Sequence, residues 1–200
     1  FYVVRTMLER AMGDGDHCHT EEMREVCGHC LRILNETCDL CNQIPVNSND
    51  PVRFFSFLTY LMIRIKAMRE SEVLVIPTSF MCDDGRDQGI IICITKTRDG
   101  TDANYSLAVI NTCEDRGLDY HATSIDPEDG AVMRNLSFEL NNIPNEKINN
   151  SSFWFMVFKG AVSPSPKHNA AFIYDKTLPF VCNMPILSAL QIGMALQIGI

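Results

Sequence analysis

Apolar residues recur at helical spacing through the first third of the chain, and they predict three helices. Residues 2–12 carry the first pattern. Thr20 then stands where a helix N-cap is expected, before a helix that should run to about residue 42. The third helix begins at Pro51, a residue that suits the first helical turn. Its buried face should be the stripe of Phe54, Phe57, Leu58, Leu61, Ile65 and Met68.

The middle of the chain is rich in short apolar runs bounded by turn residues, which predict strands. Residues 90–94 are almost continuously apolar, as expected for a strand covered on both faces. Arg98-Asp99-Gly100 should form a hairpin turn, and residues 78–87 a polar loop. The predicted strands are residues 73–76, 90–96, 105–111 and 131–140. We expect a mostly antiparallel sheet that packs against the helices.

The last quarter returns to helical patterns. Ser151 or Ser152 should cap an apolar helix over residues 153–158, and residues 168–181 should form a helix interrupted by Pro179. Residues 185–200 carry no charge and repeat Ala-Leu-Gln-Ile-Gly. That tail is shorter than the ~20 apolar residues of a membrane span, so we expect a packing helix and no span.

These patterns predict the α+β class: a helical N-terminal third, a central mostly antiparallel sheet and C-terminal helices. We divide the chain into a helical, cysteine-rich subdomain (1–70), a sheet-centred α+β domain (71–184) and the apolar tail (185–200).

Charge and cysteine content narrow the function. The net charge of −8 argues against nucleic acid as a partner, because phosphate binding requires clustered Lys and Arg. Nine cysteines, an odd number, do not suit a fully paired disulfide framework. We therefore expect an intracellular, cytoplasmic piece of a larger protein, whose partner is another protein or the remainder of that chain.

Two Cys-x-x-Cys pairs lie on the second predicted helix, Cys27 with Cys30 and Cys38 with Cys41. Such pairs supply thiolates to zinc, which would make this a zinc-stabilised interaction domain. The alternative is that the four cysteines and Leu34 form one apolar helix face that packs into the core. We favour core packing and expect no cofactor, because seven residues between the pairs leave little room for a zinc fold.

Cys18 lies between two histidines just before the Thr20 cap. A helix N-terminus stabilises a thiolate, so Cys18 is a candidate nucleophile. His17 and His19 could bind a metal, although a solvated connection explains this polar segment more simply.

A resemblance to a known family rests on two strands. Val109-Ile110-Asn111-Thr112-Cys113, followed by 117–121 (Gly-Leu-Asp-Tyr-His), resembles the Asn strand of papain-like cysteine peptidase domains in large multidomain eukaryotic proteins. The likeness covers residues 73–183. It implies a nucleophilic Cys, a general-base His that opens the first strand, and an Asn that orients this His from the second strand.

The chain departs from that pattern at the base. Gln88 occupies the expected His position, and an amide cannot take up and return a proton near neutral pH. Cys113 replaces the expected Gly. A rescue would use His121 as the base for Cys113 or Cys82, with Asp119 orienting it.

The resemblance therefore implies a degenerate, inactive papain-like domain that serves as a structural or protein-interaction module. The alternative is an active cysteine hydrolase on ubiquitin-like or peptide substrates, which would use Cys18 or Cys113 with His121.

Overall fold

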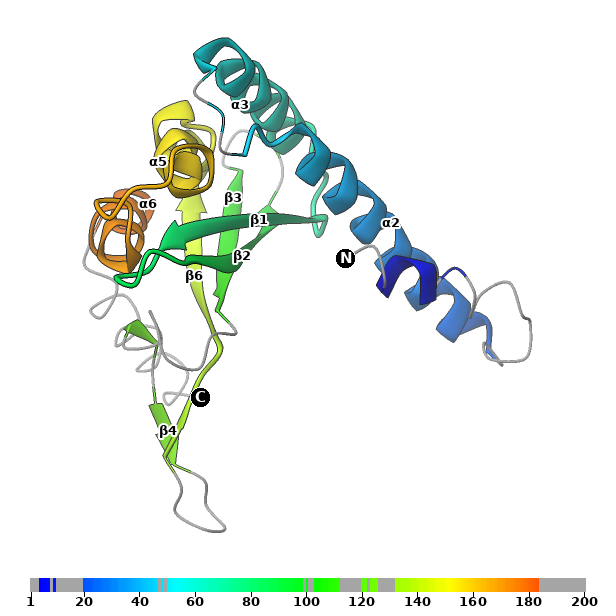
Figure 1. Ribbon diagram of the computed structural model, residues 1–200. Helices are drawn as coiled ribbons and strands as arrows, with labels where there is room; N and C mark the ends of the chain where they lie inside the picture. Colours follow the sequence, from blue (N-terminus) through cyan, green and yellow to red (C-terminus); the bar gives the residue numbers. More distant parts are fainter. Residues whose placement is uncertain are drawn as a thin grey trace.

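The computed structural model describes residues 4–7, 9, 20–46, 48, 50–98, 100, 103–111, 120–121, 123–125 and 132–183. Helices pack against a four-stranded antiparallel sheet in the order β1-β2-β3-β6, and a separate hairpin pairs β4 with β5 (Figure 1). The strands are β1 (Val73–Met81), β2 (Asp87–Arg98), β3 (Asn104–Ile110), β4 (Thr123–Ile125), β5 (Val132–Arg134) and β6 (Ser137–Pro144). The helices are α2 (Glu21–Gln43), α3 (Pro51–Lys66), α4 (Asn145–Ile148), α5 (Ser151–Val162), the π-helical η2 (Phe172–Thr177) and α6 (Pro179–Cys182). This is the α+β class that the sequence predicts.

The predicted hairpin of β2 and β3 is present, and it lies at the centre of the sheet. Its register pairs Ile92 with Val109 and Ile94 with Leu107, and all four side chains are fully buried. Alternate residues of β2, such as Ile91, are only half buried. The prediction that this strand is covered on both faces is therefore wrong for its second face.

Strand β1 is longer than predicted, because it continues through Pro77 to Met81. A proline has no N–H to give to a ladder, but β1 is an edge strand and Pro77 still pairs by position with Ile91. The predicted polar loop therefore shrinks to residues 82–86, where Gly85 takes a φ of +81°.

The predicted strand over residues 131–140 is two strands with different partners. β5 pairs with β4, whereas β6 begins at Ser137 and pairs with β3. β6 also continues through residues 141–144, beyond the end of the predicted strand at residue 140. Asn142 is accommodated there at a φ of +58°, where the register between β3 and β6 shifts.

The caps of the long helices are partly as predicted. The Thr20 hydroxyl accepts a hydrogen bond from the N–H of Met23, and the Asp50 carboxylate caps α3. The stripe predicted for α3 is buried from Phe54 to Met68. Helix α5 begins differently, because the Asn150 side chain, and neither Ser151 nor Ser152, accepts the first N–H.

Helix α5 packs closely on β1 at Gly160. A Cβ built on this residue would lie 2.3 Å from the backbone oxygen of Ser79 and 3.1 Å from the Cα of Phe80. Only a residue without a side chain allows this approach of helix and strand.

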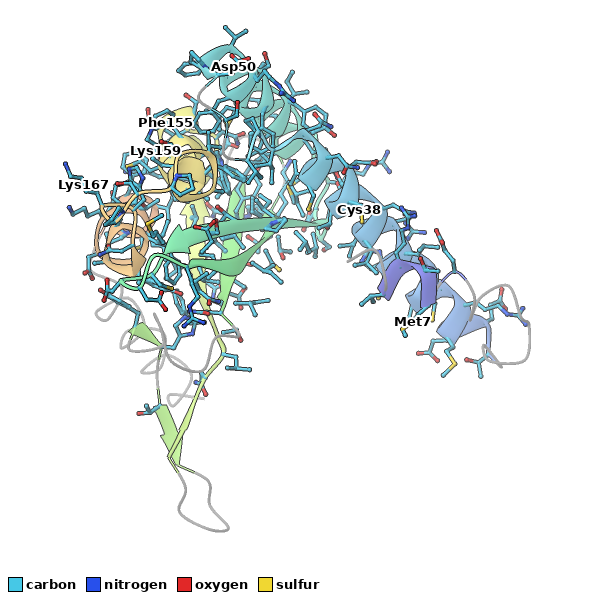
Figure 2. The ribbon with its side chains drawn as sticks, viewed as in Figure 1. Met7, Cys38, Asp50, Phe155, Lys159 and Lys167 are labelled. Atoms are coloured by element: carbon cyan, nitrogen blue, oxygen red, sulfur yellow. The ribbon has the colours of Figure 1, made fainter. Side chains whose placement is uncertain are left out.

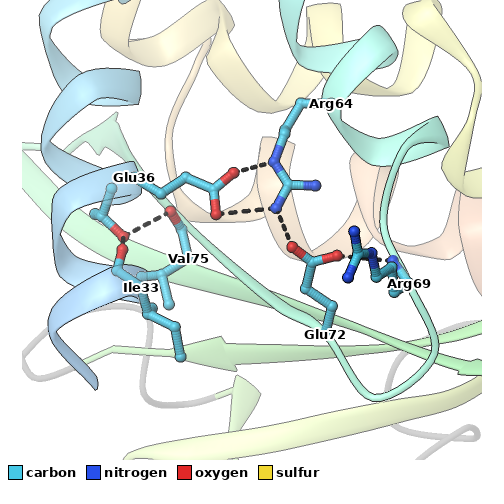
Figure 3. Close-up of polar contacts among 7 residues, drawn as sticks. Ile33, Glu36, Arg64, Arg69, Glu72 and Val75 are labelled. Carbon is cyan, nitrogen blue, oxygen red and sulfur yellow. Dashed lines mark hydrogen bonds and ion pairs between the residues drawn. The ribbon is translucent and has the colours of Figure 1, made fainter. Parts of the chain in front are cut away.

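Arg64 of α3 connects α2 to the start of β1 (Figure 3). Its guanidinium donates to both carboxylate oxygens of Glu36, at 3.0 Å for the Nη2–Oε2 pair, and also to Glu72. The Glu72 carboxylate accepts in addition the N–H of Arg69 at 2.7 Å.

The helix predicted over residues 168–181 is interrupted. It opens into the π-helical η2, where the Thr177 hydroxyl donates to the Phe172 carbonyl at 2.8 Å, and Pro179 then begins α6. The predicted tail helix over residues 185–200 lies outside the described residues.

Candidate functional site

Three polar residues that the sequence singles out come together at one end of the sheet. Gln88 lies near the start of β2, and Asn111 directly follows β3. The Gln88 side-chain nitrogen lies 3.5 Å from the Asn111 Oδ1 and also donates to the Gly89 carbonyl at 2.9 Å. His121 joins them through Tyr174 of η2. Asn111, His121 and Tyr174 are all buried, at 0%, 4% and 0% exposure.

The donors and acceptors of this cluster have one consistent direction. Because a carbonyl only accepts, the 2.9 Å contact with the Asn135 oxygen places the hydrogen of His121 on Nδ1. The other nitrogen, Nε2, then accepts from the Tyr174 hydroxyl at 3.1 Å. That leaves the Tyr174 oxygen to accept from the Asn111 amide, with which it is hydrogen-bonded. The Asn111 oxygen in turn accepts from the Gln88 amide at 3.5 Å.

Burial sets the protonation states within the chain of hydrogen bonds. It lowers the pKa of His121, although the hydrogen bond with Asn135 acts in the opposite direction. Burial also raises the pKa of Tyr174 to about 12. Near neutral pH the cluster is therefore a set of neutral groups, each satisfied by its neighbours.

Aromatic rings enclose the cluster. The Tyr120 ring stacks on Tyr174 with centroids 4.6 Å apart, and its hydroxyl donates to Asp175 at 2.9 Å. Phe138 meets the edge of His121 at 4.9 Å, and Phe80 lies against Tyr174. Within the described residues, these rings surround the polar atoms with apolar surface and leave His121 no ring nitrogen for another partner.

The structure brings only some of the predicted site residues together. Gln88, Asn111 and His121 belong to one cluster, whereas Cys18 and Cys113 lie outside the described residues, as does Asp119. Cys82 is buried in the β1–β2 turn. Both nitrogens of His121 are engaged with Asn135 and Tyr174, so the arrangement does not offer it as a base to Cys82.

Tyr174 is the residue that sequence reasoning missed. Its neighbours Phe172 and Ile173 make it look like one more member of an apolar helix. A tyrosine that must be buried needs a partner for its hydroxyl, and that requirement was the available signal. The π-helical turn that carries it could not be read from the residues, although such turns are frequent at functional sites.

The four cysteines of α2 do not form the predicted core face. Cys30 is exposed, and Cys27, Cys38 and Cys41 are only partly buried. The buried side of α2 carries Thr37 and Leu40 instead, about 100° around the helix from Cys38 and Cys41, so the core interpretation is wrong.

A shared zinc site along the same row meets a geometric obstacle. Cys27 and Cys41 are separated by 14 residues of continuous helix, which corresponds to about 21 Å. Within the described part of the chain, no group of three or more His, Cys, Asp or Glu side chains could hold a metal ion.

A shallow hollow of about 530 Å³ lies between α2 and the connection from α3 to β1. Its lining carries both signs of charge, from Arg32 and Arg69 and from Glu36, Glu70 and Glu72. Mixed charge gives this hollow no preference for an anionic or a cationic ligand.

No family model, no curated protein and no solved structure matches this chain. Among the helices that the structure describes, none combines the length and the apolar character needed to cross a membrane.

Proposed function

We propose that residues 73–183 are a papain-like domain without peptidase activity, which serves as a structural and protein-interaction module of a larger protein. The observation that supports this proposal is the pairing of Gln88 with Asn111. In the family order these two positions would hold the general base and the residue that orients it. Here the contact joins two amides, neither of which can transfer a proton near neutral pH.

The surroundings of Asn111 support the same conclusion. Its side chain is fully buried and hydrogen-bonded to Tyr174, whose oxygen lies 3.1 Å from a neutral His121. A group that orients a catalytic imidazole must hydrogen-bond that imidazole directly, on the ring nitrogen that does not face the nucleophile. The Asn111 amide is instead used inside the packed interior, where satisfying buried polar groups stabilises the fold.

None of the seven cysteines that the structure describes is joined in a disulfide. We propose on this basis that the protein works in a reducing, cytoplasmic environment, where thiols persist without pairing.

Thiol labelling tests the absence of a nucleophile. Native protein is treated with limiting iodoacetamide, and mass spectrometry gives the labelling rate of each cysteine. We expect no cysteine to react more than about tenfold faster than the exposed Cys30, because a rate above an ordinary thiol requires a depressed thiol pKa.

Labelling in denaturant provides the control, since all nine cysteines then react at similar rates. One cysteine that labels about a hundredfold faster in the native protein, and loses this advantage in His121→Gln, would establish the cysteine hydrolase instead.

A further inference from the structure

The exposed side of α3 carries apolar residues in a regular row. Val52, Phe55 and Ile63 are 72%, 59% and 63% exposed, and Thr59 fills the row between them. Their spacing of three, four and four residues places them in line along the helix, opposite the stripe that enters the core. We call Val52, Phe55, Thr59 and Ile63 the α3 ridge.

Aromatic packing holds the centre of the ridge in place. The Phe55 ring stacks on Phe54 and on Phe155 of α5, with centroids 6.4 Å apart in both pairs. Phe54 and Phe155 lie 5.2 Å apart, which closes a group of three rings. An exposed ring that is already ordered loses little conformational freedom when a partner covers it.

Positive charge surrounds the α3 ridge. Arg53 and Lys66 are exposed near its two ends. Lys159 lies over the Phe155 ring at 5.3 Å (Figure 2). Residues 51–66 contain no Asp or Glu, although the whole chain has a net charge of −8. The acid nearest in sequence, Asp50, is engaged as the helix cap.

We propose that the α3 ridge is a docking surface for an acidic amphipathic helix of a protein partner. The inference rests on the proposed function, because it names the surface and the partner chemistry of the interaction module. A row with helical spacing fits the groove between the ridges of a second helix. Carboxylates along the flanks of that helix complement Arg53, Lys66 and Lys159.

Two other occupants fit the surface less well. Recognition of an acidic membrane typically uses a cluster of about four to eight Lys and Arg residues, more than the three cations here. The chain's own residues 185–200 are uncharged and do not complement those cations.

Binding to designed probes tests the proposal on the whole chain. The acidic probes are a small panel of labelled helical peptides of about 15 residues, the length that matches the ridge, with Leu on one face and Glu along both flanks. The matched basic peptides carry Lys for Glu. A peptide of residues 185–200 and vesicles containing phosphatidylserine complete the set. Fluorescence anisotropy measures binding to the peptides, and co-sedimentation measures binding to the vesicles.

We expect the acidic peptides to bind at least about tenfold more tightly than the basic ones. Phe55→Ser and the double variant Arg53→Glu, Lys66→Glu should each weaken acidic-peptide binding about tenfold or more. The matched controls are Leu136→Ser, another exposed apolar position, and Lys167→Glu, an exposed cation away from α3; neither should change binding. Unchanged thermal unfolding midpoints would show that the variants are folded.

Three results would overturn the inference: no measurable binding by any acidic peptide, equal binding of acidic and basic peptides, or stronger binding by the vesicles or the tail peptide. The thiol-labelling experiment is independent of all three. If no acidic peptide binds and no cysteine is hyper-reactive, the docking surface is refuted and the proposed non-catalytic function stands. If acidic peptides bind and one cysteine is hyper-reactive, the docking surface stands and the non-catalytic function is refuted.

Discussion

Replacing Tyr174 by Phe removes one hydroxyl that two buried groups share. The ring of Phe fills the same space, so no cavity forms and the stacking on Tyr120 is kept. The loss is therefore confined to hydrogen bonding: the His121 Nε2 loses its donor, and one N–H of Asn111 loses its acceptor.

The magnitude follows from the burial of those two groups. A buried polar group left without a partner costs about 1–3 kcal/mol, so two of them predict a loss of about 2–6 kcal/mol in the free energy of unfolding. The matched control is Tyr120→Phe. Its hydroxyl donates to Asp175 at the surface, where water can replace it, so we expect a loss below about 1 kcal/mol.

Urea unfolding followed by circular dichroism measures both variants. The slopes of the two transitions should agree with that of the parent protein, which would show that the extent of unfolding is unchanged. If Tyr174→Phe costs no more than Tyr120→Phe, the buried chain of hydrogen bonds does not stabilise this end of the sheet as described.

Three further changes probe other contacts. Burial lowers the pKa of His121 below 6.5, so the neutral ring stabilises the fold fully above pH 6.5. Below that pH the free energy of unfolding should decline, by at most about 1.4 kcal/mol per pH unit. Urea unfolding at several pH values should show this decline in the parent protein and not in His121→Gln. Gly160→Ala should destabilise by about 1–3 kcal/mol in the same urea assay, since its Cβ would overlap the backbone of β1, whereas Gly89→Ala, which meets nothing within 4 Å, should be nearly neutral. Arg64→Met should cost about 1–2 kcal/mol at low salt and less in concentrated NaCl, because the carboxylates it leaves are partly exposed; equal losses at both salt concentrations would contradict that account.

Elements that are specified by their own residues could be predicted from the sequence. The Thr20 cap and the buried stripe of α3 followed from capping chemistry and helical spacing. The β2–β3 hairpin followed from two apolar runs around a turn that contains Gly100, observed at a φ of +92°.

Elements that depend on contacts with distant parts of the chain were harder to predict from the sequence. Pro77 suggested the end of a strand, because a proline inside a strand is tolerated only at a sheet edge or a bulge. That β1 is an edge strand is known only from the structure. The cysteines of α2 suggested a core face, since their spacing is helical, but which side of a helix meets the sheet is a tertiary property.

The candidate site likewise contains residues that the sequence indicated and one that it did not. Gln88, Asn111 and His121 were recognisable from strand positions, and the structure brings them into one cluster. Tyr174 joins them from more than 50 residues further along the chain than Asn111 and His121, on a π-helical turn that no local pattern indicates.

The placement of Pro77 has a consequence for how the protein can assemble. On the outer side of β1, the Val75 carbonyl accepts from Thr37 at 3.4 Å, and Pro77 has no N–H. Further along the strand, the Ser79 oxygen lies against Gly160. The N–H of Met81 donates to the carbonyl of His168 at 2.9 Å. This side of the sheet therefore presents no uninterrupted row of backbone N–H and C=O groups to an incoming strand. Strand addition and edge-to-edge aggregation, the usual hazards of an exposed edge, are blocked at β1 by the domain's own helices.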